Sequence, residues 1–165
     1  MTRTHVVVDS PIGPMTVVAD GETVVGIYMD DARHLPPAER FGPADDGTSV
    51  VLKEADRQLG EYFACERTTF DLPLAADGTP FQRRVWAALC EIPYGETISY
   101  GELARRIGQP TASRAVGLAN GRNPISVVVP CHRVIGSSGK LVGYGGGLSR
   151  KQTLLELEQG RNRLL

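Results

Sequence analysis

The stretch SYGELARRIGQPTASRAVGLANG, residues 99–121, decides the fold of the C-terminal half of the chain. Ser99 and Glu102 have the spacing of a capping box, which predicts a short helix that ends at the next glycine. After a Gln-Pro dipeptide, Thr111 is expected to cap a second helix over residues 112–120. Two short helices joined by so tight a turn are typical of a helix-turn-helix.

Charge is distributed unevenly along the 165 residues, although the net charge is only −1. Residues 1–80 carry 6 Lys and Arg against 14 Asp and Glu, a balance of −8, whereas residues 81–165 carry 12 against 5, a balance of +7. A basic half that contains a helix-turn-helix favours DNA as the partner. Two alternatives stay open, an inert pair of helices and an internal charge match between the halves.

The second helix of this pair has small residues, Ala115 among them, so a partner's backbone can approach it closely. Arg114 lies in its first turn, the part of a recognition helix that usually meets nucleic acid.

Composition excludes several classes of protein. Hydrophobic residues make up 41% and charged residues 22%, which is typical of globular chains. No apolar run is long enough for a membrane span, and the N-terminus lacks the apolar region of a signal peptide. The three cysteines are far apart without C-x-x-C spacing, and there are only three histidines. We therefore expect a cytoplasmic protein with no membrane partner, disulfide framework, metal site or cofactor.

The N-terminal half is predicted to be a small sheet with one helix. Three β-branched runs predict strands at residues 5–8, 15–19 and 23–28. Asp20-Gly21 predicts a hairpin between two of these strands. Residues 30–48 are expected to form a mobile loop, and Ser49 is expected to cap a helix with an apolar face. Residues 68–72 alternate like a further strand. Nothing here suggests chemistry, so this half is interpreted as a scaffold.

We place the boundary between residues 1–76, the scaffold lobe, and residues 77–165, the DNA-binding and active-site lobe. The second lobe opens with Thr79 in a capping box and proline at the first helical position. Trp86 is expected in the core, and Cys90 as a small buried residue at the end of this helix. The fold class is α+β, with a mostly helical C-terminal lobe.

A cysteine motif follows the two short helices. Residues 123–129, NPISVVV, predict a turn that leads into a buried strand, and Pro130-Cys131-His132-Arg133 comes directly after it. A cysteine beside a histidine and an arginine lies in electropositive surroundings, which lower the thiol pKa and favour a thiolate nucleophile. The alternative is a buried thiol with an unrelated histidine, because adjacent side chains do not naturally face each other.

A final helix supplies a possible third member of this group. Ser149 is expected to cap it, and Glu158 shares its inward face with two leucines. A buried carboxylate needs a partner, and His132 is the only histidine of this lobe. The sequence thus predicts that Glu158 orients His132, which in turn activates Cys131. A small rotation of the helix would instead expose Glu158.

The glycine-rich segment GKLVGYGGG, residues 139–147, lacks the ending of a P-loop and the spacing of a dinucleotide fingerprint. It suits close approach of the backbone to a flat ligand, with Tyr144 as one wall.

Taken together, these residues resemble one family. Pro130-Cys131-His132-Arg133-Val134 is similar to the active-site signature of the O6-alkylguanine-DNA alkyltransferases. Further features fall in matching order: the helix-turn-helix, Asn123-Pro124, Tyr144-Gly145-Gly146-Gly147 and Glu158. The similarity covers residues 79–159 closely, and the N-terminal lobe more loosely resembles the family's ribonuclease-H-like lobe.

The resemblance implies direct reversal of DNA damage. Cys131 would take the alkyl group from O6 of a flipped guanine, or from O4 of thymine, in double-stranded DNA. His132, acting through a water and held by Glu158, would be its base, and Tyr100 would protonate guanine N3. Asn123 would be the hinge between the reading helix and the active-site segment.

The resemblance also implies how DNA is held. The recognition helix of the winged-helix-like lobe would enter the minor groove, with Arg114 filling the gap left by the extruded base. Tyr144 would wall the base pocket and the Gly145 N–H would bond O6. The remaining residues assigned to DNA or substrate are Ser99, Ala115 and Arg133.

Two other functions remain as alternatives. A binding-only alkyltransferase-like protein would recognise the lesion with another residue, usually tryptophan, in place of the cysteine. A cysteine hydrolase with the same Cys-His-Glu set would turn over repeatedly. We expect a monomer off DNA, and the sequence leaves open both cooperative binding along DNA and the preferred size of the alkyl group.

Overall fold

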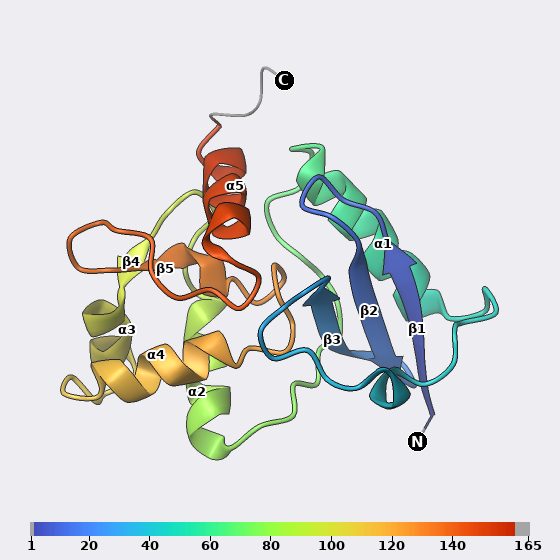
Figure 1. Cartoon of the computed structure of the whole chain (residues 1–165), viewed down its shortest axis with the longest axis horizontal. Coiled ribbons are helices and arrows are strands. Elements are labelled where there is room, and N and C mark those ends of the chain that lie inside the picture. Colours follow the sequence, from blue (N-terminus) through green and yellow to red (C-terminus); the bar gives the residue numbers. More distant parts are fainter. Residues whose placement is uncertain (1, 161–165) are drawn as a thin grey trace.

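An antiparallel sheet forms the N-terminal half of the computed structural model, which describes residues 2–160 (Figure 1). Its strands are β1 (Arg3–Val8), β2 (Met15–Asp20) and β3 (Thr23–Met29), in the order β1-β2-β3. The predicted hairpin is confirmed, since Asp20 pairs with Thr23 around Gly21, which has a φ of 62°. Helix α1 (Val50–Phe63) packs on this sheet, and Ser49 caps it as predicted by accepting a hydrogen bond from the Leu52 amide.

The predicted strand at residues 68–72 is wrong, because tertiary contacts hold this segment in another way. The Gln58 side chain bonds both backbone groups of Asp71, at 2.8 and 3.0 Å, where a strand would need a neighbouring strand. The edge of β3 is covered instead by the following residues, with the Val24 amide donating to Pro73 at 2.8 Å. Residues 30–48 form the predicted loop, apart from the 3₁₀ turn η1 (Ala38–Phe41).

The C-terminal half is mostly helical. Its elements are α2 (Pro80–Leu89), β4 (Ile98–Ser99), α3 (Tyr100–Arg106), α4 (Ser113–Gly121), the 3₁₀ turn η2 (Cys131–Arg133), β5 (Val134–Ile135) and α5 (Leu148–Glu158). Helices α3 and α4 pack on each other and on α2, as expected of a helix-turn-helix. Strands β4 and β5 form a short parallel pair beside them. The α+β class is therefore confirmed.

Helix starts follow the sequence pattern only in part. Thr79 forms the predicted capping box on α2. Ser99 caps α3, but the Glu102 carboxylate pairs with Arg105 and Arg106 instead of completing the box. The Thr111 cap is wrong, since α4 begins after Ala112 with no side-chain cap.

The predicted cap at Ser149 is also wrong. Helix α5 begins at Leu148, two residues earlier than a cap at Ser149 implies, because Gly147 with a φ of 95° turns the chain directly into it.

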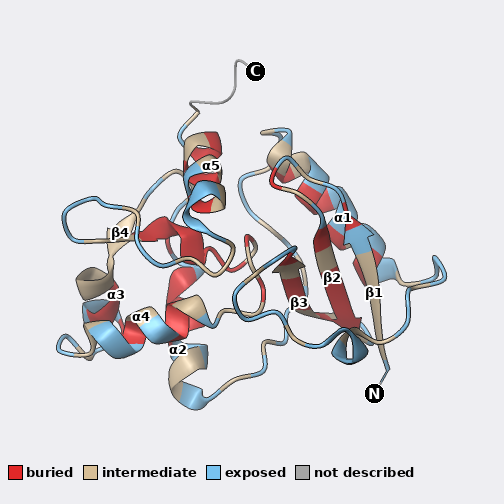
Figure 2. Cartoon of the chain, in the orientation of Figure 1, coloured by how far each residue is buried: buried red, intermediate tan, exposed pale blue. Residues whose placement is uncertain are grey.

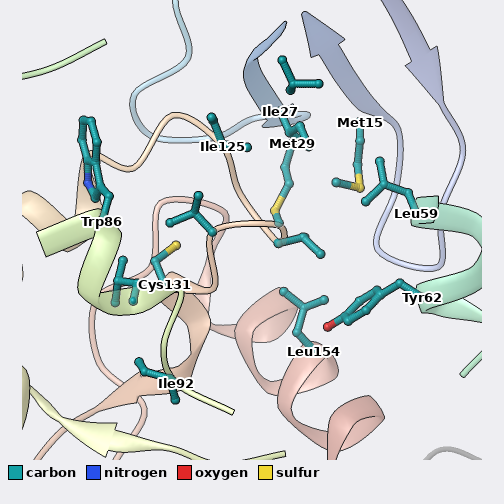
Figure 3. Packing of buried hydrophobic residues seen from close by; sticks show 14 of the residues in the cluster. Met15, Ile27, Met29, Leu59, Tyr62, Trp86, Ile92, Ile125, Cys131 and Leu154 are labelled. Atoms are coloured by element: carbon teal, nitrogen blue, oxygen red, sulfur yellow. The ribbon is translucent and has the colours of Figure 1, made fainter. Parts of the chain in front are cut away.

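One hydrophobic cluster spans both halves (Figure 2). Figure 3 shows Met15, Ile27 and Leu59 of the N-terminal half in the same core as Trp86, Cys131 and Leu154. The Trp86 Nε1 donates to the Ala119 carbonyl at 2.8 Å, which confirms Trp86 as a core residue. Cys90 is exposed, contrary to expectation, because it lies beyond the last turn of α2.

The backbone also joins the two halves just before the cysteine motif. The Ile27 amide of β3 donates to Pro124 at 2.9 Å, and the Ser126 amide donates back to Ile27 at 3.2 Å. The buried strand predicted within residues 123–129 is wrong, because Val127 adopts a φ of 72° and the Val128 amide closes a tight turn onto Ser126. A positive φ at a buried β-branched residue is strained, so its surroundings must hold it.

Within residues 2–160, no helix combines the length and the apolar character needed to cross a bilayer.

Candidate active site

Cys131 lies at the boundary of the two halves, where it opens η2 rather than ending a strand. It is 5% exposed, and its carbonyl accepts a hydrogen bond from the Asn120 side chain at 3.3 Å. A cavity of about 290 Å³ adjoins it, near the lower end of the range for small-ligand sites. Both halves line this cavity, through residues that include Tyr28, Ala32, His34, Trp86, Asn120, Asn123, Cys131, Tyr144 and Gly145.

Behind Cys131, the predicted pair of His132 and Glu158 is confirmed. The His132 Nε2 lies 2.7 Å from Glu158 Oε2, and both side chains have no exposed surface. Glu158 also accepts from Arg133, with Nε at 2.8 Å from Oε1 and Nη2 at 3.0 Å from Oε2. Helix α5 thus presents Glu158 inward, toward residues of η2.

The structure contradicts the assignment of Arg133 to DNA. Its residue exposure is only 7%, and its Nη1 donates to the Ile92 carbonyl at 2.7 Å. The guanidinium also lies over the Tyr94 ring, 5.7 Å from its centroid. The reason is Glu158, since a buried carboxylate draws the nearest arginine inward.

Electrostatics keep Glu158 ionised and His132 neutral. Burial by itself raises the pKa of Glu158, but the hydrogen bonds and charges of His132 and Arg133 outweigh it and bring that pKa to about 2. Burial lowers the pKa of His132, against the opposing effect of Glu158. A neutral His132 must donate through Nε2 to the carboxylate, which leaves Nδ1 as the basic nitrogen. This Nδ1 is buried and has no hydrogen-bond partner among the described protein atoms.

The expected lowering of the Cys131 pKa is wrong. Burial raises the pKa of this thiol, and the Asn123 side chain and the charge of Lys151 only partly oppose that effect. The resting thiol is therefore neutral, because desolvation of a thiolate outweighs the nearby positive charge. A base that takes the thiol proton is consequently needed for reaction.

Lys151 of α5 is a site residue that sequence reasoning missed. It has no exposed surface, and its Nζ donates to Val142 at 2.8 Å and lies 5.9 Å from the Tyr100 ring centroid. Burial lowers the pKa of Lys151 to about 8, while Cys131 favours its charged form. The available signal was its register, since Lys151 precedes Glu158 by seven residues on the inward face of one helix.

Asn123 and Tyr100 each hydrogen-bond a backbone segment next to Cys131 or the glycine-rich segment. Asn123 accepts from the Ile125 amide at 3.0 Å and donates to Val129 at 2.8 Å, which braces the strained turn before Cys131. The Tyr100 hydroxyl donates to Val142 at 3.0 Å. Burial, and then the charge of Cys131, raise the pKa of Tyr100, so this phenol keeps its proton.

The glycine-rich segment and the loop of the N-terminal half meet over the cavity. Tyr144 and Gly145 both line it, and the Arg33 amide donates to the Gly145 carbonyl at 2.7 Å. The hydroxyl of Tyr144 is buried without a hydrogen-bond partner among the described atoms, as is Oδ1 of Asn120. Such unpaired polar atoms indicate that a water or a polar ligand completes the cavity.

The predicted recognition helix presents an open surface. Arg114 and Ala115 of α4 are exposed, and Leu118 of the same helix is 70% exposed. The Ser99 hydroxyl is occupied by the cap of α3, where it accepts from the Glu102 amide at 3.0 Å. Residues 2–160 contain no cluster of His, Cys, Asp or Glu that could hold a metal ion.

Comparisons with known proteins agree with this geometry. The DNA-binding domain of 6-O-methylguanine DNA methyltransferase matches residues 80–160, and the ribonuclease-like domain of the same protein matches residues 4–76. The chain belongs to this family.

Two curated relatives are both named methylated-DNA–protein-cysteine methyltransferase. The relative from Mycobacterium bovis is 54% identical over 93% of this chain and 91% of its own. The one from Methanosarcina acetivorans is 49% identical over 93% of this chain and 97% of its own.

A solved structure of the O6-methylguanine methyltransferase of Mycobacterium tuberculosis has a TM-score of 0.88 at 52% identity, covering 97% of this chain and 94% of that one. Another structure of the M. tuberculosis protein, in complex with DNA, has a TM-score of 0.86 at 50% identity and covers 98% and 94%. The chain is thus an enzyme of DNA repair by alkyl transfer, and DNA is its partner.

Proposed function

We propose that Cys131 is the residue that accepts the alkyl group, from O6 of guanine or O4 of thymine in double-stranded DNA. The observation that carries the proposal is the buried His132–Glu158 pair, 2.7 Å apart, directly behind a cysteine that lines a cavity. The distance between paired atoms and the full burial of both side chains suit a base held in one tautomer.

The reaction needs one proton to move from the thiol to the base as the sulfur attacks. His132 Nδ1, the unpaired nitrogen, receives this proton through a water, while Nε2 stays bonded to Glu158. Lys151 and the Asn123 side chain stabilise the developing thiolate. The S–C bond then forms as the bond from the alkyl carbon to O6 breaks, and Tyr100 supplies a proton to N3 of the departing guanine.

The same proposal assigns the remaining residues to DNA and the flipped base. Tyr144 and Gly145 bound the base pocket, with the Gly145 N–H directed to O6. Arg114 and Ala115 enter the minor groove, and Arg114 fills the vacancy left by the base. Ser99 supports this surface as the cap of α3.

Each molecule acts once in this scheme. The product is a thioether, which is a very poor leaving group, and the scheme contains no step that removes it. We propose that the protein acts as a monomer in the cytoplasm, where a reducing environment keeps Cys131 free.

The test is the intact mass of the protein after mixing with a duplex that contains one O6-methylguanine. We expect one stable methyl adduct per molecule, located on Cys131 by peptide mapping. Cys131→Ser should form no adduct yet bind the duplex, because a serine hydroxyl is a far weaker nucleophile of similar size. Cys65→Ser and Cys90→Ser are the matched controls and should both react.

Other outcomes would favour the alternative functions. Binding without any adduct would indicate a binding-only protein, although such proteins replace the cysteine that this chain retains. Continued product release without an adduct would indicate a cysteine hydrolase. Unchanged transfer by Cys131→Ser would reject Cys131 as the acceptor.

A further inference from the structure

Tyr62 of α1 reaches the candidate site from the N-terminal half. Its hydroxyl lies 2.6 Å from Glu158 Oε2, the same oxygen that His132 Nε2 contacts at 2.7 Å. Tyr62 has no exposed surface, and Figure 3 shows its hydroxyl directed away from α1, toward Leu154 of α5. The buried face of α1 thus places a hydroxyl at the position that meets the carboxylate.

The direction of this hydrogen bond follows from the charges. An ionised carboxylate can only accept, so Tyr62 donates. Burial and the charge of Glu158 raise the pKa of Tyr62 well above its ordinary value, which keeps the phenol protonated. Tyr62 and His132 therefore share one carboxylate oxygen, Oε2, with Nη2 of Arg133, so a stronger bond from one donor weakens the bond that the oxygen forms with the others.

We propose that Tyr62 is a positioning residue of the alkyl-transfer site, through which the N-terminal half sets the basicity of His132. The role rests on the proposed function, since it matters only if His132 is the base for Cys131. By donating to Oε2, Tyr62 withdraws negative charge that would otherwise stabilise protonated His132. His132 then stays neutral and able to accept the thiol proton near neutral pH.

Other charged and titratable groups face His132 and Glu158 from the elements packed around them. They are Arg133 of η2, which bonds both carboxylate oxygens, Lys151 of α5, Cys131, and the phenols of Tyr94 and Tyr144. The Tyr62 hydroxyl donates directly to Oε2 of Glu158, the oxygen that His132 Nε2 contacts.

The experiment compares Tyr62→Phe with the full-length wild type. Removing the hydroxyl leaves more negative charge on Oε2, so the pKa of His132 should rise by about one unit. Two readouts follow this change: an NMR titration of the His132 imidazole, and the pH profile of the rate of methyl transfer to Cys131. The acid limb of the profile should move to higher pH by the same amount.

Tyr94→Phe is the matched control. It removes a hydroxyl from the same aromatic cluster, where the Tyr94 and Tyr62 ring centroids lie 6.2 Å apart, and it keeps the ring beneath Arg133. Because Tyr62 donates to Oε2 itself, both readouts should move less in Tyr94→Phe than in Tyr62→Phe. A slower Tyr62→Phe enzyme with an unmoved His132 titration would overturn the proposal, as would an equal shift in Tyr94→Phe.

A second variant covers the case in which Tyr62→Phe does not fold. 3-Fluorotyrosine at position 62 keeps the ring and hydroxyl but makes the phenol a stronger donor, so the His132 titration should move to lower pH. A shift upward or no shift would overturn the proposal. The NMR titration needs no alkyl transfer, so it separates failure of this role from failure of the proposed function.

Discussion

At the scale of single residues, Glu158 joins three buried side chains of the site, Tyr62, His132 and Arg133. Replacing it with glutamine keeps its volume but removes the charge that holds His132 in its basic tautomer. We expect Glu158→Gln to slow methyl transfer by roughly 100-fold, the lower end of the range for general base catalysis, with DNA affinity nearly unchanged. Single-turnover kinetics and a binding titration measure the two quantities. Glu156→Gln on the same helix should leave both unchanged, and an equal loss there would refute the specific role.

The same residue predicts a pH dependence of stability. The pKa of Glu158 is about 2 in the folded protein against an ordinary value of 4.5, so the folded state binds fewer protons than the unfolded state between these values. The stabilisation is therefore complete above about pH 4.5 and is lost as pH falls toward 2, by about 3 kcal/mol in all. Urea unfolding of Glu158→Gln should show a flatter pH dependence in this window. An unchanged slope would mean that Glu158 is not the titrating group.

At the scale of elements, the role of α4 can be tested. Its Arg114 either fills the space left by an extruded base or only contacts a DNA phosphate. Arg114 is exposed in its first turn. If Arg114 fills the vacancy of the flipped base, Arg114→Ala should slow transfer from duplex DNA much more than transfer from free O6-methylguanine, because only the duplex reaction requires extrusion, at a few kcal/mol. Transfer by Arg114→Ala should be partly restored when the lesion lies opposite a mismatch, because such a base is already poorly stacked and is easier to extrude.

The control for this prediction is Arg105→Ala on α3, an exposed arginine paired with Glu102. It should change the duplex and free-base rates equally, if at all. Uniform weakening of all duplexes by Arg114→Ala, with the salt slope reduced by about one, would show a phosphate contact instead.

At the scale of the whole molecule, the two halves share one core and are expected to unfold together. Ile27 of β3 is fully buried and pairs through its backbone with Pro124 and Ser126 of the other half. We expect Ile27→Ala to lower the free energy of unfolding by about 2–4 kcal/mol. Fluorescence of Trp86, which lies in the other half, should report the full loss. Val7→Ala, at an exposed position of β1, should change little. If the free energy of unfolding reported by Trp86 fluorescence were the same in Ile27→Ala as in the wild type, the two halves would unfold independently.

Local patterns in the sequence predicted much of this protein. The Asp20-Gly21 hairpin, the Ser49 cap and the capping box at Thr79 were predictable because each depends on residues within one turn of the chain. The pairing of Glu158 with His132 was predictable from helical periodicity and from the scarcity of partners. The cysteine motif and its neighbours sufficed to identify the family.

Only the tertiary structure decided the properties that depend on contacts between distant segments of the chain. Arg133 turns inward, and the thiol of Cys131 is neutral at rest, because burial and the position of Glu158 outweigh the local run of positive charge. Tyr62 lies on the buried face of α1, and its hydroxyl has a partner only because α5 places the Glu158 carboxylate against it. Sequence periodicity shows which face of an element is buried, but only packing determines what that face meets and how much water is lost there.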